Sequence, residues 1–190
     1  MEALNPNFRA KYRDWQTYLD AVFEKEADYR KAIVDRYNIK LSEAKEDFCS
    51  FVKKYDCRIL KRKNFIEAKD DDFYLLRMDF DEPVESNYFS FQLAIRKEVR
   101  NLYSIIIKPK SNLSIPSYSV QRPKPKTQLE IENFTIKLKD EYLLLEQRIS
   151  DLYKINFNFC WYRADNKSPD ILGMEGYQSF KLILDFLFND

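Results

Sequence analysis

The sequence has no histidine among its 190 residues. Histidine is the usual general base near neutral pH, the partner of most serine and cysteine nucleophiles, and the commonest transition-metal ligand. Its absence excludes triad hydrolases, cysteine–histidine proteases and HExxH metalloenzymes. We therefore expect no cofactor and no enzyme of these classes.

Glycine and cysteine are also scarce. The only glycines are Gly173 and Gly176, so neither GxGxxG nor GxxxxGK[ST] can be formed, and the common nucleotide-binding enzymes are excluded. The cysteines, Cys49, Cys57 and Cys160, are odd in number and form no CxxC pair. They are typical of free thiols in a reducing compartment.

The sequence shows neither a secretory signal nor a membrane span. Residues 1–6 lack a basic region followed by an apolar core, and no apolar run approaches the roughly 20 residues that cross a bilayer. We expect a cytoplasmic protein with no membrane association. Its net charge of +1 argues against a surface that binds polyanions everywhere, although a local patch is compatible with it.

Apolar side chains at helical spacing dominate the N-terminal region 1–56. Asn5 and Pro6 form a helix start, and the pattern predicts a helix over 6–37. Asn38 and Ile39 weaken the pattern, and Ser42 resembles a new cap. The prediction is a second helix over 42–55, which either folds back as a hairpin or continues the first with a kink, so that residues 6–55 form one long helix.

The region 57–190 begins with alternating apolar and polar residues. This alternation predicts strands over 74–80, 89–95 and 103–107, with a leading edge strand over 57–62. Short connections between such strands are typical of an antiparallel meander of about four or five strands. A proline-rich basic loop follows at 109–126.

The rest of this region predicts a helix, a strand and a helix. Thr127 and Glu130 form a capping box before a helix over 128–153, although a strand over 129–138 remains an alternative. A closing strand follows over 155–161, and a short C-terminal helix over 177–187. We expect an α+β fold in one compact unit, in which the 128–153 helix covers the apolar face of the sheet.

Acidic residues near strand ends form the first candidate site. Asp79 and Asp81 lie two apart, so their carboxylates share a face and could hold Mg²⁺ for phosphoryl transfer. Glu67 and Lys69 resemble half of a nuclease motif, but a charged surface turn explains them adequately. A metal-dependent phosphodiesterase or nuclease is the third functional hypothesis, and a solvated strand end is the simpler interpretation of Asp79 and Asp81.

Basic residues gather between 96 and 126, where Glu98 is the only acid. Interleaved with aromatics on an extended backbone, such residues can follow a phosphate chain, so single-stranded nucleic-acid binding is the second hypothesis. An ordinary solvated loop has the same features. The basic residues are Arg96, Lys97, Arg100, Lys108, Lys110, Arg122, Lys124 and Lys126.

Aromatic residues on the first helix carry the leading hypothesis. Exposed tryptophan and tyrosine on a rigid helix anchor protein interfaces, whereas buried ones fill a core. The leading hypothesis is a non-catalytic inhibitor, immunity-type protein or adaptor that covers a partner's surface, and the same helix could also join two copies of the chain. The candidate contact residues are Tyr12, Trp15, Tyr18 and Tyr29.

Overall fold

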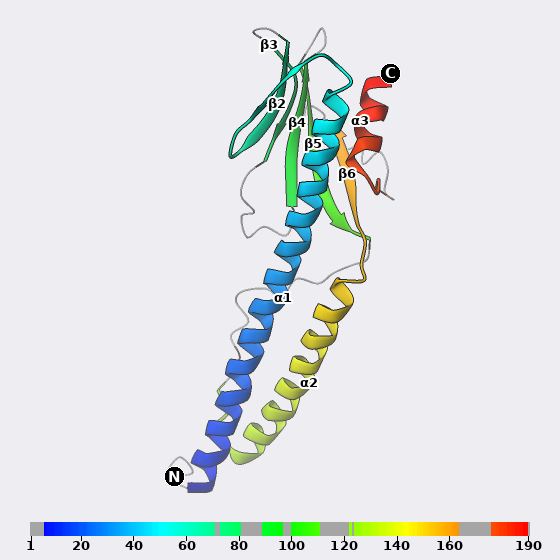
Figure 1. Ribbon diagram of the computed structural model, residues 1–190. Helices are drawn as coiled ribbons and strands as arrows, with labels where there is room; N and C mark the ends of the chain where they lie inside the picture. The colour runs from blue at the N-terminus through cyan, green and yellow to red at the C-terminus, as the bar shows by residue number, and fades with distance from the viewer. Residues whose placement is uncertain are drawn as a thin grey trace. The chain divides into compact units, whose positions relative to one another are not determined.

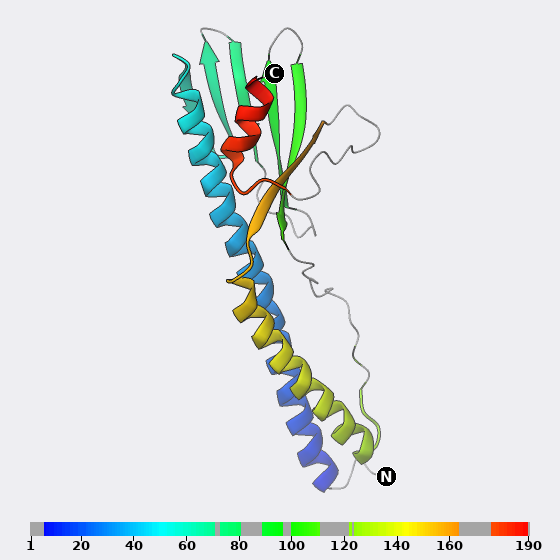
Figure 2. The same ribbon diagram turned by 90° about the vertical axis from the view of Figure 1, so that its right-hand side faces the viewer.

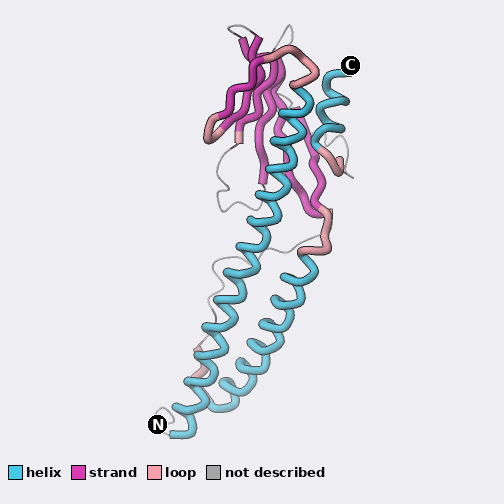
Figure 3. Tube along the Cα trace, viewed as in Figure 1, coloured by secondary structure: helices cyan, strands magenta, loops and turns pink. Residues whose placement is uncertain are grey.

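The computed structural model describes residues 6–70, 73–80, 89–96, 100–110, 122, 124–163 and 176–189. These ranges contain three helices and a six-stranded antiparallel sheet, which confirms the α+β class (Figures 1 and 3). The helices are α1 (Pro6–Val52), α2 (Gln128–Leu152) and α3 (Phe180–Asn189). The strands are β1 (Arg58–Lys61), β2 (Phe65–Asp70), β3 (Phe73–Asp79), β4 (Phe89–Arg96), β5 (Arg100–Pro109) and β6 (Phe157–Arg163). No helix in the described ranges is both long enough and apolar enough to span a bilayer.

The chain divides into two compact units, each built from separate segments. The first comprises Met1–Val34 and Ser114–Lys154, and the second comprises Asp35–Leu113 and Ile155–Asp190. This division by compactness differs from the division at residue 56 that the change in apolar spacing indicates, because α1 contributes to both units and the segment containing α2 is inserted between β5 and β6. The two units are described separately below.

Of the two alternatives for the N-terminal region, one long helix is confirmed and the hairpin is wrong, because α1 continues from Pro6 to Val52. Asn38 and Ile39 are exposed, so their weaker helix propensity costs only tenths of a kcal/mol each, about the spread among ordinary residues. The buried stripe continues past them through Tyr37 and Leu41. Tertiary burial thus overrides local propensity, and Ser42 lies inside the helix instead of capping one.

In the first unit, α2 packs beside the N-terminal part of α1 (Figures 1 and 2). The capping box is confirmed: Glu130 N–H donates to Thr127 Oγ1, and Thr127 N–H donates to Glu130 Oε2, both at 3.2 Å. The alternative strand over 129–138 is therefore wrong. The buried apolar side chains of this unit are Phe8, Trp15, Leu19, Val22, Tyr29, Ala32 and Ile33 from α1 and Ile131, Leu138, Leu145 and Leu152 from α2.

The second unit contains the sheet, whose strands follow sequence order from β1 to β6. Every neighbouring pair is antiparallel, and β6 pairs with β5, as expected for the closing strand. The pattern did not predict β2. Its inward-facing residues, Ile66 and Ala68, alternate with Glu67 and Lys69. The small alanine and the two charges make this strand look like a surface turn.

Within the second unit, α3 and the C-terminal part of α1 cover one face of the sheet. Phe180 of α3 packs against Phe91 of β4 and Phe159 of β6, with ring centroids 5.2 and 5.8 Å apart. Phe51 of α1 packs against Phe188 of α3 at 5.0 Å. The sequence predicts that the helix over 128–153 covers the sheet. In the structure this helix is α2, which belongs to the first unit, where its buried stripe packs on α1.

Candidate functional site

The four aromatic residues proposed as contacts occupy different environments in the first unit. Trp15 and Tyr29 are 2% and 0% exposed, so both belong to the core. Tyr12 is half-buried and packs against Trp15 with tilted rings, whose centroids are 5.1 Å apart. Only Tyr18 is exposed. The sequence cannot separate these cases, because core and interface aromatics share the same helical spacing.

A second line of apolar side chains lies on α2, and sequence reasoning missed it. Leu129, Ile136 and Leu143 are 59–67% exposed, and Leu144 beside them is 47% exposed. A spacing of seven residues returns a helix to within about 20° of the same direction. We call these four residues the outer face of α2. Their spacing is visible in the sequence, but the stronger stripe that includes Leu138 obscured it.

The outer face of α2 points away from α1. Leu129 and the buried Ile131 are two residues apart, which on a helix means nearly opposite directions. Large apolar side chains in a row on the solvent side of a helix are uncommon unless a partner covers them. This arrangement distinguishes α2 from an ordinary amphipathic helix, whose outer side is polar.

Acidic side chains bracket the centre of this face. Glu132 and Asp140 lie one turn before and one turn after Ile136, so they share its side of the helix. Glu132 accepts a hydrogen bond from Lys11, which lowers the pKa of the Glu132 carboxyl. Lys139 also neighbours Ile136, but its ammonium lies 4.8 Å from the ring centroid of Tyr18 on α1. Glu132 and Lys139 thus both contact α1, and Asp140 is the charge beside Ile136 that has no ion pair among the described residues.

The basic segment predicted to contact nucleic acid is split between the two units. Arg122, Lys124 and Lys126 belong to the first unit, and the last two are exposed. Lys108 and Lys110 are exposed at the end of β5 in the second unit. Arg96 is exposed on β4; Lys97 lies outside the described residues, and of Arg100 only the backbone is described.

Arg122 takes part in an internal ion-pair network. Its Nη2 lies 3.0 Å from Glu26 Oε1 on α1 and 2.6 Å from Glu141 Oε1 on α2. Its guanidinium also stacks on Phe23, 4.8 Å from the ring centroid. Two carboxylates compensate this cation, so Arg122 holds its own segment on the helices and contributes little to binding an external anion.

The acidic candidates are also engaged by neighbouring side chains. Arg77 binds both carboxylate oxygens of Asp79 at 2.7–3.0 Å and lies 3.4 Å from Glu67. Lys69 lies 3.1 Å from Glu67, which is on strand β2 and not on a turn. Asp81 lies outside the described residues. Within the described ranges, no group of three or more acidic, cysteine or histidine side chains is placed to hold a metal.

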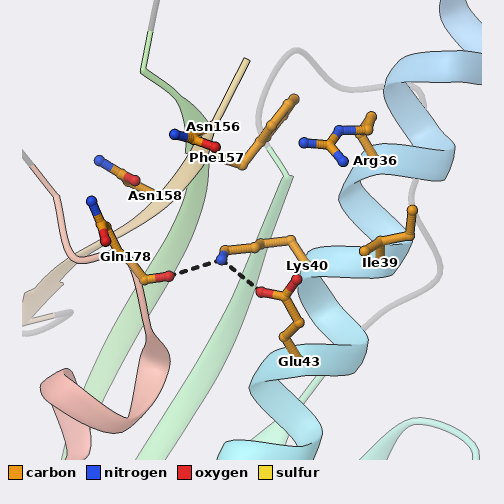
Figure 4. A pocket seen from close by; sticks show the side chains of 8 residues that line it. All are labelled: Arg36, Ile39, Lys40, Glu43, Asn156, Phe157, Asn158 and Gln178. Carbon is orange, nitrogen blue, oxygen red and sulfur yellow. Dashed lines mark hydrogen bonds and ion pairs between the residues drawn. The ribbon is translucent and has the colours of Figure 1, made fainter. Parts of the chain in front are cut away.

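A polar hollow of about 270 Å³ lies in the second unit between α1, the start of β6 and the segment before α3 (Figure 4). The Lys40 ammonium donates to Glu43 at 2.6 Å and to the Gln178 carbonyl at 2.8 Å. Arg36 donates to the Ile155 carbonyl at 2.9 Å and lies over the Phe157 ring. Both cations are thus bound to acceptors of the chain itself, so this hollow serves to join α1 to β6 and α3.

Comparison with known proteins finds no matching family model, no matching curated protein and no matching solved structure.

Proposed function

We propose that this protein is a non-catalytic binding protein that contacts another protein through the outer face of α2. The observation that supports it is the line of Leu129, Ile136 and Leu143, more than half exposed and at a spacing of seven residues. Burying such side chains contributes about 25 cal/mol for each Å² of apolar surface removed from water. The proposal keeps the leading hypothesis from the sequence and moves the contact from the buried Trp15 and Tyr29 to α2.

The proposed partner presents an amphipathic helix whose apolar line is bordered by lysine or arginine. A spacing of seven residues is the repeat with which one helix packs along another. Leu129 and Leu143 lie about 21 Å apart along the axis, which corresponds to two heptads of a partner helix. Asp140 beside Ile136 favours a positive flanking charge on that helix, whereas Glu132 is already paired with Lys11.

The other two hypotheses have less support. Arg122 is already paired with two carboxylates of the chain, so it adds little to nucleic-acid binding by residues 96–126. The other cations of this segment are divided between the two units. Metal-dependent catalysis at Asp79 would first have to break the contacts of that carboxylate with Arg77. We therefore favour protein binding over both of these hypotheses.

The direct test measures binding of a synthetic helical peptide with two leucine heptads flanked by lysine. Fluorescence anisotropy should show saturable binding to the wild-type protein, and much weaker binding when glutamate replaces the flanking lysines. Ile136→Ser combined with Leu143→Ser should abolish binding. The matched control, Leu182→Ser on α3, removes a 51% exposed leucine from the other unit and should bind as the wild type does.

A photo-crosslinking residue at position 136 then tests the face with natural partners. The proposal predicts crosslinks to a segment of another protein with apolar heptads and basic flanks, absent when the probe stands at position 182. Crosslinks to an acidic segment, or to none, would contradict it. Self-association that Ile136→Ser and Leu143→Ser abolish would assign the face to a second copy of this chain and overturn the proposal.

A further inference from the structure

A second hollow in the second unit is lined mainly by basic side chains. Its volume is about 370 Å³, and it lies between residues 42–49 of α1 and the turn that joins β1 to β2. Lys45, Lys61, Arg62 and Lys63 line it, whereas Glu46 is its only acidic lining residue. Cations from two elements far apart in the sequence therefore converge on one small space. Sequence reasoning missed this cluster, because only the fold brings Lys45 to the basic turn.

Lys45 is held in a fixed position at this hollow. Its ammonium lies 3.6 Å from the ring centroid of Phe80, which follows β3. Phe80 is 7% exposed, and its N–H donates to the carbonyl of Asn64 in the β1–β2 turn. Phe80 therefore contacts the Lys45 ammonium through its ring and the β1–β2 turn through its backbone. Among the described residues, Lys45 has no carboxylate within ion-pair distance.

The environment of Lys45 favours an external anion. Partial burial lowers the pKa of the Lys45 ammonium, because removing a charge from water without a counter-charge is unfavourable. An anion in the hollow would compensate that cost. Lys61 and Arg62 are exposed, and they also lack an ion-pair partner among the described residues. In the polar hollow of Figure 4, by contrast, Lys40 is already paired with Glu43.

We propose that this basic hollow binds a phosphorylated small molecule that carries at least two negative charges. The convergence of cations on a confined space favours a compact ligand over a nucleic-acid strand, which needs cations spread along a groove. Ser42 also lines the hollow, and its hydroxyl can donate to a phosphate oxygen. A space of this size is at the lower end of the range for small-molecule sites.

The test is calorimetric titration with inorganic pyrophosphate at low and moderate ionic strength. The wild-type protein should bind it, and more weakly as salt rises. Lys45→Met keeps the apolar stem over Phe80 but removes the charge, and should weaken binding about tenfold or more, as expected for a hydrogen bond to a charged group. Glu46→Gln should strengthen binding severalfold, because it removes the negative charge that lines the hollow.

Two further variants keep the test decisive if Lys45→Met disturbs folding. Lys61→Ala with Arg62→Ala alters only exposed side chains and should also weaken binding about tenfold. Lys31→Ala with Lys124→Ala removes two exposed charges from the first unit and should leave binding unchanged. No binding by the wild type, or an equal loss in both double variants, would overturn the proposal. A single-stranded oligonucleotide that binds tighter than pyrophosphate, and depends on Lys45, would overturn the small-molecule assignment.

Discussion

Arg122 and Glu26 form a largely buried ion pair although 96 residues separate them in the chain. Their side chains are 12% and 11% exposed, and Arg122 also binds Glu141. A charge in the buried stripe of a helix is costly unless another charge compensates it. The segment before α2 supplies that charge, so this contact ties the segment to both helices of the first unit.

Removing the cation should destabilise the first unit. Arg122→Met leaves Glu26 buried without a partner and should lower the free energy of unfolding by about 2–4 kcal/mol. Urea unfolding followed by fluorescence of Trp15 measures this, in a Trp161→Phe background that leaves Trp15 as the only tryptophan. Trp15 and Arg122 line the same hollow, so the reporter lies close to the change.

The matched variants separate pairing from packing. Combining Arg122→Met with Glu26→Gln should recover part of the loss, because the buried charge is then gone. Lys11→Ala breaks the exposed pair with Glu132 and should change stability far less than Arg122→Met does, because water screens an exposed pair. If Arg122→Met cost no more than Lys11→Ala, the pair would not be a structural determinant of this unit.

The hydroxyl group of Tyr29 should lower the stability of the folded protein or leave it unchanged. Tyr29 is fully buried, and no hydrogen-bond partner for its hydroxyl exists among the described residues. At neutral pH, the free energy of unfolding of Tyr29→Phe should therefore equal that of the wild type or exceed it by about 0.5–1 kcal/mol. Tyr18→Phe changes an exposed tyrosine on the same helix and should have almost no effect. Urea unfolding at neutral pH makes the comparison.

The same residue predicts a loss of stability in alkali. Burial raises the pKa of the Tyr29 phenol, and Arg148 offsets part of that effect. As pH rises past about 10, the ordinary tyrosine pKa, the unfolded state releases its proton while the folded state retains it. The free energy of unfolding should then fall with pH, and more steeply in the wild type than in Tyr29→Phe. Parallel slopes for the two proteins would contradict this.

The elements could largely be predicted from the sequence, because each has a local signal. The Thr127–Glu130 capping box located the start of α2 to the residue. The alternation around Met78 and Leu93 identified the middle strands, which pair in register. The signal failed where tertiary contacts outweigh local preference: Asn38 lies inside α1, and Ala68 lies in a buried strand.

The candidate sites were harder to predict, because exposure and pairing depend on the fold. Residue type alone does not indicate which apolar side chain can contact a partner. Trp15 is buried whereas Ile136 is exposed, and this difference depends on the fold. The partner of Arg122 lies on another helix, and the cation Lys45 meets its basic neighbours only when the β1–β2 turn packs against α1. Such relationships leave no periodic pattern in the sequence.

Asp47 should stabilise the start of α3 in the second unit. Its Oδ2 accepts hydrogen bonds from Ser179 Oγ at 2.8 Å and from the Lys181 N–H at 3.0 Å. Asp47→Ala removes a negative charge from the N-terminus of the helix and should cost about 1–2 kcal/mol. Glu46→Ala, the neighbouring exposed carboxylate, should cost less than about 0.5 kcal/mol.

Fluorescence of Trp161 in a Trp15→Phe background reports this change. The ring of Trp161 packs against Phe186 of α3, with centroids 5.7 Å apart, so loosening of α3 alters its surroundings. Urea unfolding should shift to lower concentration in Asp47→Ala and remain unchanged in Glu46→Ala. Equal behaviour of the two variants would show that α3 does not depend on Asp47.

Gly176 occupies a position where both backbone and space exclude a side chain. Its φ is +66°, which favours glycine, and an added Cβ would lie 2.9 Å from the Cβ of Asn158 and 3.0 Å from the Sγ of Cys160. The next residue, Tyr177, exchanges two backbone hydrogen bonds of 2.7 Å with Phe159 of β6. The glycine therefore lets the segment before α3 reach the edge of the sheet.

Gly176→Ala should lower the free energy of unfolding of the second unit by about 1–3 kcal/mol, the range for a non-glycine residue held in this backbone region. Gly176→Asn separates the two causes, because asparagine tolerates positive φ better than alanine but carries the same Cβ. Since the Cβ contacts remain, asparagine should recover only part of the loss, as measured by urea unfolding with Trp161 fluorescence. Wild-type stability in Gly176→Asn would show that the contacts with Asn158 and Cys160 relax freely and that backbone conformation alone requires glycine here.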